Sequence, residues 1–192
     1  MLTFAITTTT KLAGISLHKD NRLLGEIKIE VSRTHSTTIL DQIDSLFAWI
    51  GEKLDNVENV LVSIGPGSFT GVRIAISVVK GMFYGRNVNF YEVNELDALA
   101  YQVFYSLDSN FLSQDNGSDE NSKIEIYSMI DSGKEKITGT LKNKVLFLTD
   151  DRMRISTATF VQMFLNNVLE KSDIFQLKPD YLEKSQAERD KK

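Results

Sequence analysis

Three short apolar segments open the chain, at residues 2–6, 12–17 and 23–31. The run Thr7–Thr10 separates the first two, and the polar turn Lys19-Asp20-Asn21 separates the second from the third. β-Branched residues favour strands, and a polar turn between two short apolar runs is typical of a hairpin. The pattern predicts three consecutive antiparallel strands.

From residue 36 the apolar positions recur every three or four residues, which predicts a helix over 36–54. An apolar strand over 57–64 and a second helical period over 72–83 follow, and Gly85 is a plausible C-terminal residue for that helix. Residues 88–93 predict another strand, and Asn94 is a candidate N-cap for a third helix. The predicted order is β-β-β-α-β-α-β-α.

The second half of the chain has a different composition. Residues 106–123 are rich in Ser, Asn and Asp and predict a flexible connection between a first lobe, 1–105, and a smaller second lobe with a polar tail, 124–192. In that second lobe we expect a hairpin of 124–130 with 136–141, a strand over 145–148, and a helix capped by Ser156.

Composition narrows the possible functions. The 192 residues include no cysteine, which excludes thiolate catalysis and Cys-ligated zinc. The net charge is −4, whereas binding to RNA phosphates normally requires clustered Lys and Arg. No run reaches the roughly 18 apolar residues of a membrane span. The composition therefore predicts a cytoplasmic protein without a membrane segment, in which any contact with RNA, including tRNA if that is the substrate, is made only indirectly through a partner.

The glycine-rich segment Gly65–Arg73, with the sequence GPGSFTGVR, joins the strand at 57–64 to the second helix. It resembles the GPGSFTGxR signature of the bacterial TsaB (YeaZ) family, which belongs to the actin and sugar kinase ATPase superfamily. Further matches follow the family's order at Arg33-x-His35, Ile130-Asp131 and Pro179-x-Tyr181-Leu182. The resemblance implies an α/β, two-lobed actin-like ATPase (ribonuclease H-like) fold, with mixed sheets flanked by helices and a reduced second lobe.

The glycine-rich segment has two possible roles. Its glycines let the backbone turn tightly, Thr70 is a candidate cap for the following helix, and Arg73 can reach a phosphate or a carboxylate. A tight strand-to-helix turn with Arg73 in a structural ion pair explains the same residues, and the pattern G-x-x-x-x-G-K-[ST] is absent. The candidate residues for a nucleotide or interface loop are Gly65, Gly67, Ser68, Thr70, Gly71 and Arg73.

Other positions that bear on nucleotide or metal chemistry are equivocal. Thr7 stands where the TsaB family usually has an aspartate, and its neutral hydroxyl cannot hold hydrated magnesium as a carboxylate does. Asp131 matches the family's second-lobe aspartate, although a turn aspartate that bonds its own backbone explains it equally well. The two histidines, His18 and His35, form no H-x-x-x-H pair, so no metal site is predicted.

The resemblance also implies partners and a role. In the TsaB family the first two helices pair with the catalytic subunit TsaD, and TsaB forms a homodimer when alone. We expect a non-catalytic subunit, without intrinsic activity, that supports a TsaD-type transferase in making threonylcarbamoyladenosine in tRNA, with a TsaE-type ATPase completing the assembly. No cofactor of its own is expected; ATP or ADP with magnesium is a candidate at the shared interface. The alternative is a free-standing small-molecule kinase or ATPase. Candidate interface residues are His35, Leu40, Ala75, Val78, Val79 and Met82.

Overall fold

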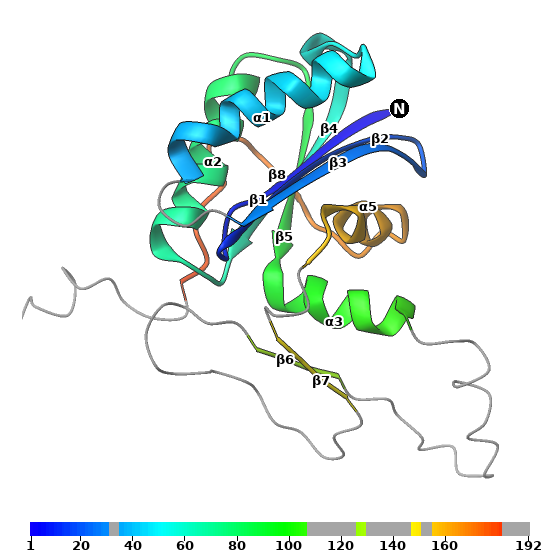
Figure 1. The fold of residues 1–192 in the computed structure, drawn as a ribbon, viewed down its shortest axis with the longest axis vertical. Helices are drawn as coiled ribbons and strands as arrows, with labels where there is room; N and C mark the ends of the chain where they lie inside the picture. Colours follow the sequence, from blue (N-terminus) through cyan, green and yellow to red (C-terminus); the bar gives the residue numbers. More distant parts are fainter. Residues whose placement is uncertain (31–34, 107–125, 130–146, 151–154, 182–192) are drawn as a thin grey trace, which may run out of the picture.

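A six-stranded mixed sheet, in the order β3-β2-β1-β4-β5-β8, runs through the computed structural model (Figure 1). The structure describes residues 1–30, 35–106, 126–129, 147–150 and 155–181. The strands are β1 (Leu2–Thr7), β2 (Leu12–Lys19), β3 (Arg22–Glu30), β4 (Val57–Gly65), β5 (Asn89–Asn94), β6 (Ile126–Met129), β7 (Phe147–Asp150) and β8 (Lys171–Ser172). The helices are α1 (His35–Ile50), the short 3₁₀ helix η1 (Leu54–Asn56), α2 (Phe69–Phe83), α3 (Glu95–Ser106) and α5 (Thr157–Leu165).

The predicted order of elements over residues 1–105 is confirmed. β1, β2 and β3 form the expected antiparallel meander, and β4 and β5 add to β1 as parallel strands. The first helix is shorter than predicted because Gly51 takes a φ of 77°, a left-handed conformation typical of a residue just after a helix. Gly85, with a φ of 71°, has the same role after α2.

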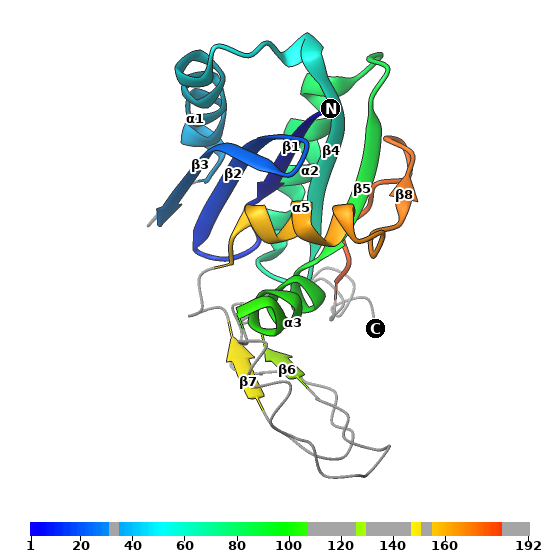
Figure 2. The ribbon, with the colours of Figure 1, turned by 90° about the vertical axis from the view of Figure 1, so that its right-hand side faces the viewer.

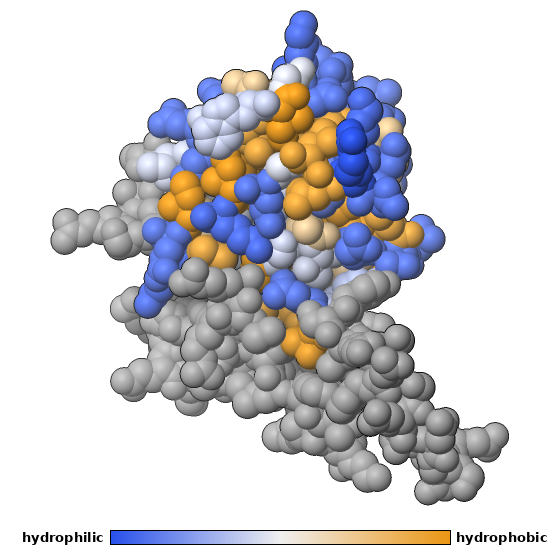
Figure 3. Space-filling model, turned by 45° about the vertical axis from the view of Figure 1, so that its right-hand side comes forward, coloured by the Kyte–Doolittle hydropathy of each residue, from blue (hydrophilic) through white to orange (hydrophobic). Residues whose placement is uncertain are grey.

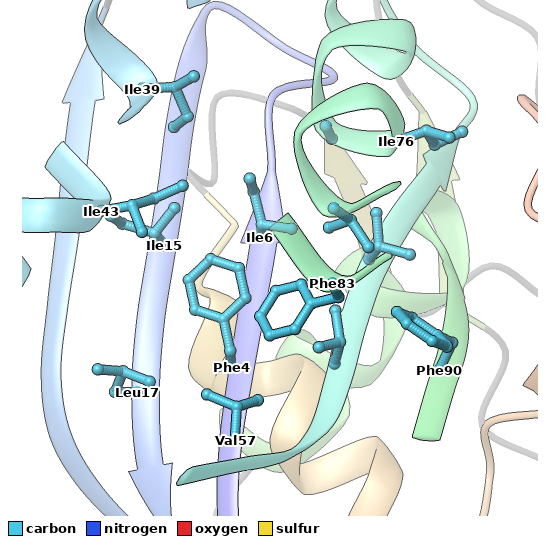
Figure 4. Close-up of a cluster of buried hydrophobic side chains, with 14 of the residues drawn as sticks. Phe4, Ile6, Ile15, Leu17, Ile39, Ile43, Val57, Ile76, Phe83 and Phe90 are labelled. Atoms are coloured by element: carbon cyan, nitrogen blue, oxygen red, sulfur yellow. The ribbon is translucent and has the colours of Figure 1, made fainter. Parts of the chain in front are cut away.

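Helices cover both faces of the sheet (Figure 2). α1 and α2 pack on one face over a core in which Phe4 lies between Phe47 and Phe83, with ring centroids 6.1 and 6.0 Å away. Figure 4 shows Phe4 and Phe83 side by side in this core. α3 and α5 cover a second cluster that includes Ala5 and Leu61. β1 is buried along its whole length, so it is the centre of both cores.

The C-terminal part of the chain corrects the predicted lobes. The helix with cap Ser156 forms as predicted, and the Ser156 hydroxyl accepts a bond from the Ala158 amide. However, strand β8 is the edge strand of the six-stranded sheet, and helix α5 packs on a face of that sheet. Both elements therefore belong with the first lobe and not with the second lobe assigned to 124–192. The physical reason is that Phe160 and Val161 are fully buried against the sheet.

Of the predicted second lobe before residue 155, only residues 126–129 and 147–150 lie within the described residues. β6 pairs in parallel with β7 as a separate two-stranded sheet beside α3. The strand predicted at 136–141, the turn at Asp131 and nearly all of the connection 106–123 lie outside the described residues. Their predicted structure stays a prediction.

A buried histidine in β2 makes stability depend on pH. His18 is 1% exposed, its Nε2 lies 3.2 Å from the Ser16 hydroxyl, and its Nδ1 has no partner among the described residues. Burial disfavours the imidazolium and lowers the pKa of His18 from 6.5 to about 4. The neutral ring therefore stabilises the fold above pH 6.5, and this contribution is lost as the pH falls towards 4.

We expect His18→Gln to lose less stability than the wild type on acidification, because glutamine does not titrate. The difference between pH 7.5 and 4.5 is expected to be about 2 to 3 kcal/mol, measured by urea denaturation at the two pH values. Equal losses in the two proteins would show that His18 does not titrate with unfolding.

Candidate functional site

The glycine-rich turn joins the carboxyl end of β4 to the start of α2. The cap of α2 is Ser68, whose hydroxyl accepts a bond from the Gly71 amide at 3.4 Å. The prediction of Thr70 as the cap is wrong, because Phe69 and Thr70 already lie in the first turn of the helix. The preceding Gly65–Pro66 peptide bond is cis, and Gly65 has a φ of 107°.

This turn packs directly against the loop Thr7–Thr10, which we call the threonine loop. The Ser68 amide donates to the Thr9 carbonyl oxygen at 2.6 Å, and the Thr8 hydroxyl donates to the Gly71 carbonyl oxygen at 2.6 Å. A Cβ atom at Gly67 or Gly71 would overlap the backbone of the threonine loop. These two glycines are therefore needed for close approach between two backbones.

A buried carboxylate lies beneath the threonine loop. Glu95, the first residue of α3, is fully buried, and its two carboxylate oxygens accept from the Thr7 hydroxyl at 3.1 and 3.2 Å. The hydroxyls of Ser63 and Thr9 also bond to it. Burial raises the pKa of Glu95, while the three hydroxyl bonds act in the opposite direction.

Sequence reasoning missed Glu95. The candidate cap was its neighbour Asn94, and that prediction is confirmed by the bond from the Leu96 amide to the Asn94 side chain at 2.9 Å. An acidic residue in the first turn of a helix is usually explained by the helix dipole. Only the three-dimensional meeting of β1, β4 and α3 reveals that its carboxylate points inward.

Arg73 lies in an aromatic clamp on the surface. Its Nε donates to the Tyr181 hydroxyl at 2.7 Å, its guanidinium lies 3.9 Å above the Phe69 ring, and Phe69 stacks on Tyr181 with centroids 4.5 Å apart. In the described part of the chain Arg73 has no carboxylate partner, so the structural ion pair considered for it is not found. Guanidinium nitrogens are strong donors to carboxylates and phosphates, so Arg73 is the candidate anion-binding group among these residues.

The clamp also fastens the C-terminal segment to the glycine-rich turn. The Asp180 amide donates to the Ile64 carbonyl oxygen at 2.7 Å, and the Asn94 side-chain amide donates to the Asp180 carboxylate at 3.2 Å. The match noted in the sequence at Pro179-x-Tyr181 thus lies against the match at Gly65–Arg73, although more than a hundred residues separate them.

Two surface pockets adjoin these elements. A pocket of about 420 Å³ lies on the outer side of α2 and is lined by Phe69, Thr70, Arg73, Ile74, Ser77 and Val78. A second pocket, of about 550 Å³, is lined by residues of β5, α3 and the segment after α5, among them Glu92, Asp97 and Glu170. Burial, and after it the nearby Asp180, raise the pKa of Asp97. Neither pocket is lined by the threonine loop.

The candidate interface residues separate into two groups. Leu40 is 49% exposed, and Val78 and Met82 are half-buried, so these three side chains reach the surface. Ala75 and Val79 are fully buried in the core under α2, which corrects their assignment to a partner surface. The face of α2 that packs on its own sheet includes them, and one helix face cannot serve both surfaces.

The other candidates are placed only in part. His35 is the first residue of α1, but its side chain lies outside the described part of the structure, as does Asp131. On the face drawn in Figure 3, apolar patches lie between charged side chains. Among the described residues there is no group of three or more His, Asp or Glu side chains that could hold a metal ion. No described helix is long and apolar enough to cross a membrane.

The fold and the glycine-rich turn define an actin-like α/β protein, and the comparisons give its family. The family model for TsaD, tRNA N6-adenosine threonylcarbamoyltransferase, matches residues 17–113, just over half of the chain, and the chain belongs to this family. Within it, the resemblance is to TsaB proteins.

The TsaB protein of Haemophilus influenzae is 30% identical over 102 residues, 52% of this chain and 42% of that protein. The TsaB protein of Escherichia coli is 29% identical over 100 residues, 52% of this chain and 43% of that protein. Both are named as tRNA threonylcarbamoyladenosine biosynthesis proteins.

A solved structure extends the comparison to the rest of the chain. YeaZ from Pseudomonas aeruginosa superposes with a TM-score of 0.68 and 18% identity, over 94% of this chain and 99% of that one. This likeness confirms the predicted actin-like α/β fold. The sequence matches, in contrast, span less than half the length of the TsaB proteins of H. influenzae and E. coli.

Proposed function

We propose that this chain acts in the synthesis of threonylcarbamoyladenosine in tRNA, as a non-catalytic subunit that binds a TsaD-type transferase through α1 and α2. The observation that carries this proposal is the family match over residues 17–113, which contains both helices and the glycine-rich turn. Three curated relatives, each matching about half of the chain, are named for this biosynthesis. A location in the cytoplasm is part of the proposal.

The outer face of α2 suits a partner helix. Ser77 and Gly81 lie four residues apart on the exposed side, and a Cβ atom at Gly81 would meet nothing within 4 Å. Small residues at this spacing let a second helix approach closely. Ile74 and Val78 line the 420 Å³ pocket beside them and provide apolar surface. Ser77 and Gly81 are thus residues that α2 does not use in its own core, whereas the partly buried Ile74 and Val78 contact that core and also line the pocket.

Charge favours self-association through the same two helices when the transferase is absent. α1 has exposed Asp41 and Asp44 and no Lys or Arg, whereas α2 has Arg73 and Lys80 and no acidic residue. A two-fold axis that sets α1 of one copy against α2 of another therefore brings opposite charges together. The homodimer is the second partner that we propose, and a TsaE-type ATPase is the third.

A nucleotide with magnesium at the shared interface is a further part of the proposal. Arg73 has two terminal nitrogens without a hydrogen-bond partner among the described residues, and the hydroxyl-bearing Thr70 and Ser77 line the same pocket. A guanidinium with neighbouring hydroxyls suits a phosphate or a carboxylate of the assembled complex. Calorimetry of the complex with ATP and magnesium tests this, with Arg73→Ala as the variant expected to lose binding. No feature of the described residues favours the alternative of a free-standing kinase or ATPase.

The partner face is tested by mixing the chain with the TsaD-type transferase of the same source. Ser77→Arg and Gly81→Arg place a long charged side chain on the exposed side of α2, where it blocks the approach of a helix. We expect each to weaken the complex by at least about tenfold, measured by size-exclusion chromatography with light scattering and by calorimetry. The matched control is Asn21→Arg, in the exposed turn between β2 and β3, which is expected to bind as the wild type does. Wild-type affinity of both α2 variants would contradict the proposed interface.

A further inference from the structure

The carboxylate of Glu95 joins the ends of three neighbouring segments. β1 ends at Thr7, β4 runs through Ser63, and α3 begins at Glu95 directly after β5. The hydroxyls of Thr7 and Ser63 both bond to the carboxylate, and no Lys, Arg or His among the described residues pairs with it. The carboxyl ends of parallel strands are where open α/β sheets usually bind their ligands. In this chain an internal side chain fills that place.

Thr7 and Glu95 are chemically complementary. The TsaB pattern has an aspartate where this chain has Thr7, and an aspartate there would put its oxygens against those of Glu95. Two carboxylates that share a buried site cannot both be ionised without a large free-energy cost. The hydroxyl of Thr7 instead donates to both oxygens of Glu95, at 3.1 and 3.2 Å. The donor at position 7 and the acceptor at position 95 therefore fit each other.

The same contacts leave no room for a phosphate at the threonine loop. The hydroxyls of Thr7 and Thr9 bond to each other at 3.0 Å and to Glu95, and the Thr8 hydroxyl bonds to the glycine-rich turn. The backbones of the loop and the turn are in contact at Gly67 and Gly71. A phosphate would have to separate them and would come close to a buried carboxyl group. The residues at this loop do not fit the nucleotide that an ATPase fold implies.

We propose that this chain supplies the carboxylate of the threonine loop from Glu95 on α3 instead of from the end of β1, and that Glu95 thereby closes the loop to nucleotide phosphates. Glu95 is a positioning residue in this proposal, since it holds the threonine loop against the glycine-rich turn at the start of α2. The proposal concerns the chain alone, so its test does not depend on the transferase.

Exchange of the two positions tests the proposal. We expect Thr7→Asp to lower the urea midpoint by about 1 M or more, because it adds a second buried carboxylate, and Glu95→Ser to lower it similarly. The double variant Thr7→Asp/Glu95→Ser moves the carboxylate back to β1, and we expect a midpoint within about 0.5 M of the wild type. If the decrease in urea midpoint of the double variant equalled the sum of the two single decreases, the proposal that Glu95 replaces a carboxylate at position 7 would be overturned.

A neutral variant keeps the test decisive if Thr7→Asp does not fold. Glu95→Gln preserves size and one acceptor oxygen, and its new amide NH2 group can donate to the carboxylate introduced at position 7, so we expect Thr7→Asp/Glu95→Gln to fold where Thr7→Asp alone does not. Because the pKa of Glu95 is raised above 4.5 in the fold, wild-type stability contains a component that falls as the pH rises from 4.5 through the raised pKa. Glu95→Gln is expected to lack this component. A double variant that stays unfolded, or an unchanged pH profile, counts against the role of Glu95.

The closed loop is tested by calorimetry of the isolated chain with ATP and magnesium. Arg73→Ala removes the anion-binding group on α2, and we expect this variant to show no binding at millimolar nucleotide. Binding that persists in Arg73→Ala and is lost on the further change Thr9→Val would show that the threonine loop accepts a phosphate, and would overturn the proposal.

Discussion

Gly71→Ala is expected to destabilise the chain by about 3 kcal/mol or more, although alanine is the better helix former. The new methyl group would overlap the carbonyl oxygen of Thr8, and the contact is between two backbones, so no side chain can rotate away. To relieve this overlap, the threonine loop would have to move away from α2, and that movement would break the bond from the Thr8 hydroxyl to the Gly71 carbonyl oxygen. Urea denaturation followed by circular dichroism measures the loss.

Gly81→Ala is the matched control on the same helix. A Cβ atom at Gly81 has open space around it, so only helix propensity changes there. We expect this variant to gain up to about 1 kcal/mol. If Gly71→Ala were as stable as Gly81→Ala, the contact between the threonine loop and the glycine-rich turn would not exist in solution.

The contact between the threonine loop and the glycine-rich turn could not be predicted from the sequence. The periodicity of the apolar residues predicted the strands and helices of residues 1–105, and local chemistry predicted Asn94 and Ser156 as caps, because each cap bonds within three residues of itself. The glycines at 67 and 71 were recognised as a turn, but their neighbours are Thr8 and Thr9, about sixty residues away. Pairing over that distance leaves no trace in spacing.

The misplaced C-terminal segment has a similar cause. The apolar face of α5 was visible in the sequence, yet an apolar face does not specify which sheet it covers. Figure 2 shows α5 across the sheet from α2, where Phe160 closes the second core. Glu95 was missed for the opposite reason, since its chemistry is ordinary for the start of a helix and only its complete burial is unusual.

The division of α2 into a core face and a partner face also depends on the structure. Periodicity places Ala75 and Val79 on the apolar face of this helix, but it does not say whether that face packs on the chain's own sheet or on a partner. The structure buries Ala75 completely and exposes Ser77. The small residues of α2 therefore have two roles: Gly71 and Ala75 allow close packing within the chain, and Ser77 and Gly81 leave open surface.

Ala75→Glu is expected to unfold most of the chain. Ala75 is fully buried in the core between α2 and the sheet, and a glutamate there adds both volume and an unpaired charge. Burial of a charge without a partner costs several kcal/mol. Because the stability of a folded domain is about 5 to 15 kcal/mol, this one change removes much of it. Circular dichroism and a thermal melt of the purified variant measure the effect.

Ala48→Glu is the control, since Ala48 lies on the exposed side of α1 and the same substitution there meets water. We expect its melt to match that of the wild type. The comparison also decides how a binding experiment is interpreted: loss of the transferase in Ala75→Glu would report unfolding, whereas loss in Ser77→Arg with a wild-type melt would report the interface. If Ala75→Glu melted like the wild type but no longer bound the transferase, Ala75 would belong to the partner surface. That result would contradict the division of α2 into a core face and a partner face.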